Sequence, residues 1–200
     1  MSSLSQVSPS ITDQIRFDHS HVLVSFHQYT ANAKKAVKKA LAGTICDALE
    51  MHATLEEEIL YPVLHQLHPT NPLVIKIEPE TDQILLKIAE LRAIPVDDSR
   101  HDSMFYELMR DVLHHVADEE TKLLPEVDRL LSKKQLNELG AAMVKRRLEL
   151  MKPKPGKIAR ETLVGFSGST TAIVVGVAGA LIAGGLLSKK LPAQQAPRLT

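Results

Sequence analysis

Apolar side chains recur every three to four positions along the first 150 residues, which is the spacing of one face of an α-helix. The pattern predicts amphipathic helices at about 10–31, 33–67, 72–94, 100–131 and 133–151. No stretch alternates apolar and polar residues convincingly, as a half-buried β-strand does. Long helices joined by short loops make an up-down antiparallel bundle. We therefore predict an all-α fold in which four helices converge and the fifth packs outside or leads away.

Prolines mark the ends of the predicted helices. His-Pro-Thr-Asn-Pro at 68–72 predicts a turn, and Lys-Pro-Lys-Pro-Gly at 152–156 predicts a linker that cannot continue a helix. A loop is expected at 95–98, where Asp98 or Ser99 can cap the helix that follows.

The composition indicates an aliphatic core. Only 4% of the residues are aromatic and tryptophan is absent. The single cysteine, Cys46, excludes an intrachain disulfide and is expected to be a small core residue. The helical period passes through Gly43, so this glycine is predicted to lie within a helix, whereas Pro79 is expected to kink one.

The formal net charge of zero conceals an asymmetry along the chain. Residues 1–144 carry 14 Lys and Arg against 22 Asp and Glu, a balance of −8. Residues 145–200 carry 10 against 2, a balance of +8. An acidic module is thus joined to a basic tail, and the acidic part argues against nucleic acid as a partner.

The tail contains 27 residues without a charge, at 162–188. About 20 apolar residues span a bilayer, so this segment predicts a single transmembrane helix. The alternative is a loosely specified apolar tail rich in glycine and alanine. Seven Lys and Arg at 145–160 against three after 188 favour a tail-anchored protein with its bundle on the cytoplasmic side.

Small residues recur at every fourth position of this predicted span, at Ala172, Gly176, Ala180 and Gly184. Such a stripe lets two membrane helices approach closely, so the tail can form a homo-oligomer. The domain organisation that we predict is a flexible N-terminus, a metal-binding bundle, a basic linker, the membrane helix and a C-terminal tail, at 1–10, 11–150, 151–161, 162–188 and 189–200.

Two stretches of the chain are nearly the same. Residues 52–62 and 115–125 both fit His-x-x-x-Glu-Glu-x-x-x-x-Pro, at an offset of 63 residues. On a helix, a residue and its fourth neighbour lie on one face. Each stretch therefore points an imidazole and a carboxylate in one direction, and two such helices facing each other make a metal cage.

Five polar residues lie on the apolar stripes that must converge in the core: His19, His52, Glu56, His115 and Glu119. A polar side chain in a core is costly unless it is paired or bound. A single such histidine would be interpreted as a hydrogen-bonded core residue, but three with two matched carboxylates favour metal ligation. This ligand set suits iron, with manganese or zinc as alternatives, and it lacks the paired cysteines of closed zinc sites.

The remaining polar residues receive a plainer interpretation. Glu57, Glu58 and Glu120 are expected to be solvated or to orient the ligating imidazoles. Tyr61 is expected to pack in the core. Positions at the surface or far from the centre are predicted for the other histidines and for one lysine group, which are His21, His27, His65, His68, His101, His114, Lys34, Lys35, Lys38 and Lys39.

These motifs resemble the hemerythrin-like (HHE cation-binding) family over about residues 11–144. The residues that carry the resemblance are Asp18-His19, His52-x-x-x-Glu56 with Leu60-Tyr61-Pro62, and His115-x-x-x-Glu119 with Leu124-Pro125. The resemblance implies a four-helix bundle around a non-haem, usually di-iron, centre. Members bind dioxygen or serve oxygen, redox or iron sensing, and some act on peroxide or nitric oxide.

One position departs from the family pattern, which has a histidine in the third helix. Thr81 occupies that place here, after Glu80. Threonine is a poor iron ligand. Either Glu80 supplies a carboxylate to the metal, or a water takes the position, or one metal is bound weakly.

The sequence thus predicts a membrane-anchored protein with non-haem iron, in which His19, His52 and His115 are terminal ligands and Glu56 and Glu119 bridge or chelate. It would bind or sense dioxygen, related small oxidants or iron. Two alternatives are a di-iron oxidase or peroxide or nitric oxide scavenger, and a structural helical module that the metal reinforces. No general acid–base pair is visible beyond the ligands, so binding or sensing ranks above catalysis.

Overall fold

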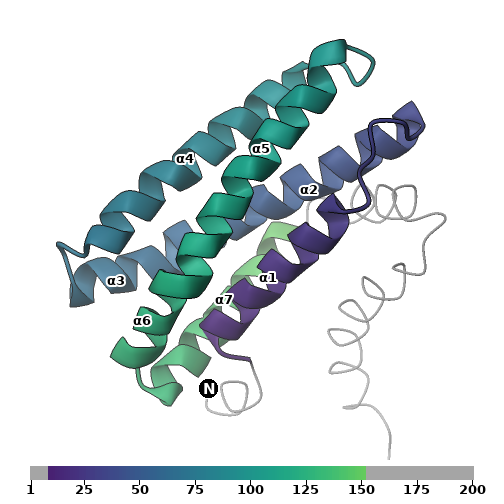
Figure 1. The fold of residues 1–200 in the computed structure, drawn as a ribbon. Coiled ribbons are helices and arrows are strands. Elements are labelled where there is room, and N and C mark those ends of the chain that lie inside the picture. Colours follow the sequence, from purple (N-terminus) through teal and green to yellow (C-terminus); the bar gives the residue numbers. More distant parts are fainter. Residues whose placement is uncertain (1–8, 152–200) are drawn as a thin grey trace, which may run out of the picture.

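The computed structural model describes residues 9–151, and within that range it is helical without any β-strand (Figure 1). The prediction of an all-α bundle is confirmed for this part of the chain. Its elements in chain order are α1 (Ile11–Phe26), α2 (Lys35–Leu55), η1 (Glu56–Leu60), α3 (Tyr61–Leu67), α4 (Pro72–Ala93), α5 (Ser99–Asp118), η2 (Glu119–Leu123), α6 (Leu124–Leu130) and α7 (Lys133–Met151).

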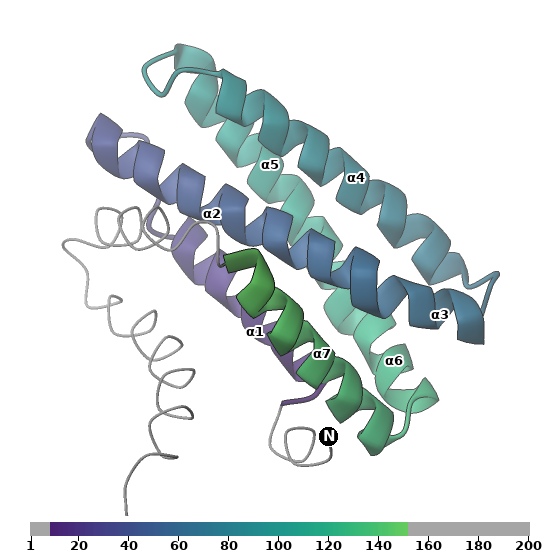
Figure 2. The ribbon, with the colours of Figure 1, turned by 180° about the vertical axis from the view of Figure 1, so that it is seen from behind.

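Four antiparallel rods make up the bundle. The first and third are α1 and α4 alone, whereas the second is the continuous run α2–η1–α3 and the fourth is α5–η2–α6. The fifth predicted helix, α7, packs outside the four, against α1, α2 and η1, as the view from behind shows (Figure 2).

Side chains at three helix starts satisfy backbone N–H groups that have no partner within the helix. Ser10 accepts from the N–H of Asp13 at 3.1 Å, Asn71 caps α4, and Asp98 caps α5. The first helix is shorter than its periodicity predicted. It ends at Phe26, and the following residues form turns, although Tyr29 within them remains buried.

A π turn interrupts the second rod at η1 and the fourth rod at η2. In these turns the N–H of Tyr61 bonds to the carbonyl of Glu56, and that of Leu124 bonds to the carbonyl of Glu119, five residues back instead of four. A proline directly follows each of these donors. Because proline lacks an N–H and its ring collides with the carbonyl four residues earlier, a wider turn accommodates it within a continuing helix.

A close approach at Gly140 fits α7 against the start of α1. A Cβ atom at this position would lie 2.1 Å from the carbonyl oxygen of Pro9, so a side chain could not be placed there without a backbone shift. The side chain of Gln14 donates to the carbonyl of Gly140 at 2.7 Å. These contacts fix α7 on the outside of the bundle and bring its basic residues over α1.

The buried apolar side chains form two clusters. One contains Ile45, Ile88 and Phe105, and the other contains Ile15, Leu64 and Val127. Cys46 is buried in the first cluster and Gly43 lies within α2, as the sequence predicted. The polar residues of the repeated motif lie along the rods between the two clusters, so the bundle brackets them with apolar packing on both sides.

Two residues assigned to the surface are buried instead. His101 is 5% exposed and lies 3.2 Å from the hydroxyl of Tyr29, while Lys38 is 8% exposed and pairs with Asp102 at 2.9 Å. Tyr29 also donates to Asp102, so these side chains form one network at the end of the bundle where α5 begins. The surface assignment was wrong because these residues face the turns after α1, whose course helical periodicity does not predict.

Within residues 9–151, no helix is both long and apolar enough to cross a bilayer. The predicted linker, membrane span and C-terminal tail lie outside the described residues.

Candidate metal centre

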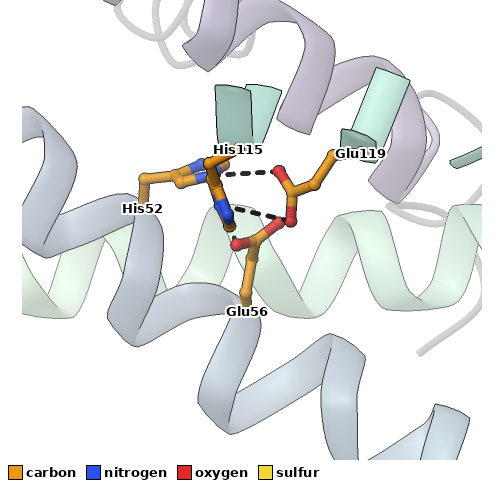
Figure 3. A group of neighbouring side chains, drawn as sticks. All are labelled: His52, Glu56, His115 and Glu119. Carbon is orange, nitrogen blue, oxygen red and sulfur yellow. Dashed lines mark ion pairs between the residues drawn. The ribbon is translucent and has the colours of Figure 1, made fainter. Parts of the chain in front are cut away.

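The repeated motif brings four side chains together in the middle of the bundle. His52 and Glu56 come from the second rod, and His115 and Glu119 come from the fourth (Figure 3). One nitrogen or oxygen of each lies within 4.8 Å of those of the other three. All four side chains are buried, and both carboxylates are wholly inaccessible to solvent.

The two helical pairs have similar internal geometry. His52 Nε2 lies 3.2 Å from Glu56 Oε2, and His115 Nε2 lies 3.5 Å from Glu119 Oε1. Each glutamate opens a π turn, at the same register in both copies. Such turns occur often at functional sites, because the inserted residue changes where the neighbouring side chains point.

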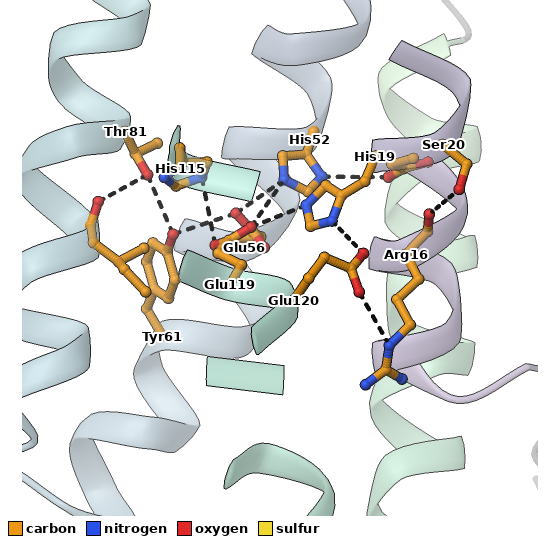
Figure 4. A network of polar contacts seen from close by, with 12 residues as sticks. Arg16, His19, Ser20, His52, Glu56, Tyr61, Thr81, His115, Glu119 and Glu120 are labelled. Carbon is orange, nitrogen blue, oxygen red and sulfur yellow. Dashed lines mark hydrogen bonds and ion pairs between the residues drawn. The ribbon is translucent and has the colours of Figure 1, made fainter. Parts of the chain in front are cut away.

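His19 reaches this group from α1. Its Nε2 lies 3.0 Å from Glu119 Oε2, and its Nδ1 lies 2.8 Å from Glu120 Oε1 (Figure 4). Arg16 lies 3.5 Å from the other oxygen of Glu120. Glu120 therefore orients the imidazole of His19 so that Nε2 faces the buried carboxylates, which is the role predicted for it.

The second nitrogen of His52 faces a carboxylate in the same way. Its Nδ1 lies 3.5 Å from Asp18 Oδ2, and Arg147 of α7 donates to both oxygens of Asp18 at 2.9 and 2.6 Å. Burial raises the pKa of Asp18, but the contacts with His52 and Arg147 outweigh it and hold that pKa below its ordinary value. Asp18 is thus kept ionised beside the imidazole.

The α4 side of the centre has no imidazole. Thr81 is buried there, and its hydroxyl donates to the carbonyl of Ile77 at 3.2 Å and lies 3.3 Å from the hydroxyl of Tyr61. Glu80 does not join the group: it is partly exposed and lies 3.4 Å from Lys76. The structure therefore brings together His19, His52, Glu56, His115 and Glu119 of the predicted ligands, and leaves Glu80 outside.

The two buried carboxylates cannot easily both be charged. Burial and the charge of Glu119 raise the pKa of Glu56 to about 8. Burial also raises the pKa of Glu119, but contacts with His19, His52 and His115 outweigh it and leave that pKa below its ordinary value. The pair therefore shares one proton near neutral pH.

The imidazoles differ for the same reason. Burial lowers the pKa of His52, but Glu56, Asp18 and Glu119 outweigh it and leave that pKa well above its ordinary value. Burial lowers the pKa of His115, and the charge of Glu119 only partly offsets it.

Several buried polar atoms of the centre satisfy no hydrogen bond within residues 9–151. They are both ring nitrogens of His52, Nδ1 of His115, and Oε1 of Glu56 and of Glu119. Buried polar atoms are nearly always paired, and an exception needs an explanation. Imidazole nitrogens and carboxylate oxygens are also the donors that iron, manganese and zinc accept. The residues present therefore fit a bound cation.

A cavity of about 10 Å³ adjoins the imidazoles, on the order of the space that one water-sized ligand occupies. Its wall combines Asp18 and the three candidate histidines with aliphatic side chains, which are Val22, Leu49, Val112 and Val116.

These features define a helical bundle with a buried histidine–carboxylate centre. The family model of the hemerythrin HHE cation binding domain matches residues 10–127. The match spans more than half of the chain, so the chain belongs to this family.

One similar solved structure is the crystal structure of a hemerythrin HHE cation binding domain-containing protein from Mycobacterium kansasii. The TM-score is 0.61 at 17% identity, over 76% of this chain and 99% of that chain, and at this identity the likeness concerns the fold alone. A comparison with curated proteins finds no significant match.

Sequence reasoning missed two residues of the centre. Arg147 carried no signal, because its contact with Asp18 joins residues 129 positions apart. Tyr61 was assigned to core packing, yet its hydroxyl lies 3.3 Å from Glu56 Oε2. A usable signal was present in the second case: Tyr61 aligns with Leu124 in the other copy of the motif, and it precedes Pro62 on the rod that faces Thr81.

Proposed function

We propose that this protein binds non-haem iron, normally as a di-iron centre, through the imidazoles of His19, His52 and His115 and the carboxylates of Glu56 and Glu119. The observation that carries the proposal is the pair of fully buried carboxylates whose Oε1 atoms accept no hydrogen bond in residues 9–151. Buried carboxylates are retained in proteins when they pair with cations. The neighbouring imidazoles make a transition metal the fitting cation.

We further propose that the centre binds or senses dioxygen, related small oxidants or the iron itself. Iron held there would supply a redox-active Lewis acid with a coordination position for a small ligand. The protein's own contribution is the cavity beside the imidazoles: Val22, Leu49, Val112 and Val116 exclude all but a small molecule from it. Asp18 and Glu120 hold the rings of His52 and His19 in place.

The experiment is metal analysis of the purified protein, with ultraviolet and visible spectra recorded without oxygen and again in air. Stoichiometric iron and a spectrum that changes with oxygen support the proposal. Zinc or manganese at full occupancy after growth with excess iron would contradict it. Measurement of peroxide consumption separates binding or sensing from the alternative, an enzyme that scavenges peroxide.

The membrane is the proposed location. The support is the sequence alone: 162–188 lack charge over a length sufficient to span a bilayer, and basic residues are denser on the side of the bundle. A tail anchor would place the metal centre at the cytoplasmic surface of a membrane, where the tail helices of two copies can pair through their small residues.

A further inference from the structure

The two halves of the centre are not equivalent. The repeated His-Glu pairs recur at an offset of 63 residues, and the same register, at an offset of 62, matches His19 of α1 with Thr81 of α4. His19 Nε2 lies 3.0 Å from Glu119, the carboxylate of the fourth rod. The corresponding place beside Glu56, the carboxylate of the second rod, has no histidine.

The hydroxyl of Tyr61 occupies that place (Figure 4). It lies 3.3 Å from Glu56 Oε2 and 3.3 Å from Thr81 Oγ1, and the side chain is 3% exposed. The residue that aligns with it in the other copy is Leu124, on the rod that faces His19. A phenol oxygen is therefore found in the half that lacks the imidazole, and an aliphatic side chain in the half that has it.

Distances at Tyr61 match those at the other donors. Bonds of iron-like metals to nitrogen and oxygen are about 2.0–2.2 Å long, so two neighbouring ligands at a right angle lie roughly 3 Å apart. The oxygen of Tyr61 is 3.3 Å from Glu56 Oε2, the same edge that His52 Nε2 makes at 3.2 Å. The separation of His19 from Glu119 is 3.0 Å.

Hydrogen bonding leaves this oxygen available. Thr81 donates its only hydroxyl hydrogen to the carbonyl of Ile77. Tyr61 has one hydrogen for two acceptors, Thr81 and Glu56, both at the long distance of 3.3 Å. Neither contact is short enough to be a strong hydrogen bond.

We propose that Tyr61 is a metal ligand of this centre, whose phenolate oxygen stands in for the imidazole that Thr81 omits. Phenolate is an established ligand of iron in proteins. Ligation replaces the O–H bond of Tyr61 with an oxygen–iron bond, and the proton leaves to water. This inference rests on the proposed iron binding.

The test uses the full chain in detergent, loaded with iron(II) and oxidised in air. A phenolate on iron(III) produces a charge-transfer absorption in the visible region, and laser excitation within it enhances the ring vibrations of the ligating tyrosine. We expect both signals in the wild type and neither in Tyr61→Phe. Tyr29→Phe is the matched control, because it removes a buried, hydrogen-bonded tyrosine hydroxyl at the end of the bundle, and it should keep both signals.

Iron content provides a second measurement. Tyr61→Phe should lower bound iron by about one equivalent per chain, because a lost ligand weakens one metal position. Adding Thr81→His to Tyr61→Phe should restore the iron without restoring the phenolate signals. Unchanged iron content and spectrum in Tyr61→Phe would overturn the inference.

The outcomes separate this inference from the proposed function. A wild-type protein that binds no iron contradicts both. Iron bound in the wild type without tyrosine ring vibrations overturns only the assignment of Tyr61, and this measurement needs no variant to fold.

Discussion

Arg147 of α7 donates two hydrogen bonds to the carboxylate of Asp18 on α1, at 2.9 and 2.6 Å. Asp18 in turn lies 3.5 Å from the Nδ1 atom of His52, whose other nitrogen faces Glu56. The family match ends at residue 127, so α7 lies beyond it. A helix outside the matched domain therefore takes part in orienting a candidate ligand.

Replacing Arg147 with methionine should weaken metal binding by about 10-fold, the lower end of what the loss of such an outer partner costs. The reason is that Asp18 would lose the cation that keeps it ionised beside His52. Competition titration with a chelator measures the affinity. Arg146→Met is the matched control, because Arg146 pairs with Glu58 at the surface and should leave the affinity unchanged. Equal effects of the two substitutions would contradict the relay through Asp18.

The double substitution His52→Ala with His115→Ala should abolish metal binding, since it removes an imidazole from each copy of the motif. It should lower the melting temperature of the metal-loaded protein, because a metal stabilises only the state that binds it. Metal analysis and thermal unfolding check both statements. His114→Ala, on the exposed side of α5, should change neither. One or more equivalents of metal retained by the double variant would disprove the cage.

Glu80 and Thr81 are neighbours with opposite expected behaviour. Glu80→Ala should leave the iron content unchanged, because this side chain lies beside Lys76 and outside the centre. Thr81→His should raise iron affinity by adding an imidazole beside the metal position. Iron titrations of the two variants measure this. Loss of iron in Glu80→Ala would mean that the carboxylate turns inward when metal binds.

Metal binding should release protons at neutral pH. Burial and the charge of Glu119 raise the pKa of Glu56 to about 8, so this carboxyl is mostly protonated at pH 7 in the metal-free protein. A metal binds the deprotonated form, so its affinity should rise with pH and level off above about 8. Calorimetry in buffers of different ionisation enthalpy counts the protons. The same number released at pH 9 as at pH 7 would rule out Glu56 as their source.

The full chain should fractionate with membranes and resist carbonate extraction, because 162–188 carry no charge over a sufficient length. Residues 1–150 alone should remain in the supernatant. Gly176→Leu with Gly184→Leu should weaken crosslinking between copies without releasing the protein, since bulky side chains separate the helices. Full-length protein in the carbonate supernatant would remove the span, whereas unchanged crosslinking would remove only the pairing face.

The local sequence determined the helices and the two His-Glu pairs. Residues four apart on a helix are neighbours wherever that helix lies, so the contacts of His52 with Glu56 and of His115 with Glu119 could be predicted before any fold was known. The convergence of His19 on the same centre followed from its place on an apolar stripe, because buried faces must meet.

Only the tertiary structure decided the remaining contacts of the centre. Glu80 and Thr81 are adjacent in sequence, but one residue turns a helix by about 100°, so Thr81 faces Tyr61 while Glu80 faces Lys76. Which of the two points inward depends on how α4 is rotated against its neighbours. Likewise, Arg147 meets Asp18 only because Gly140 lets α7 approach α1 closely. Periodicity determines which residues share a face, whereas the packing of distant segments determines what that face meets.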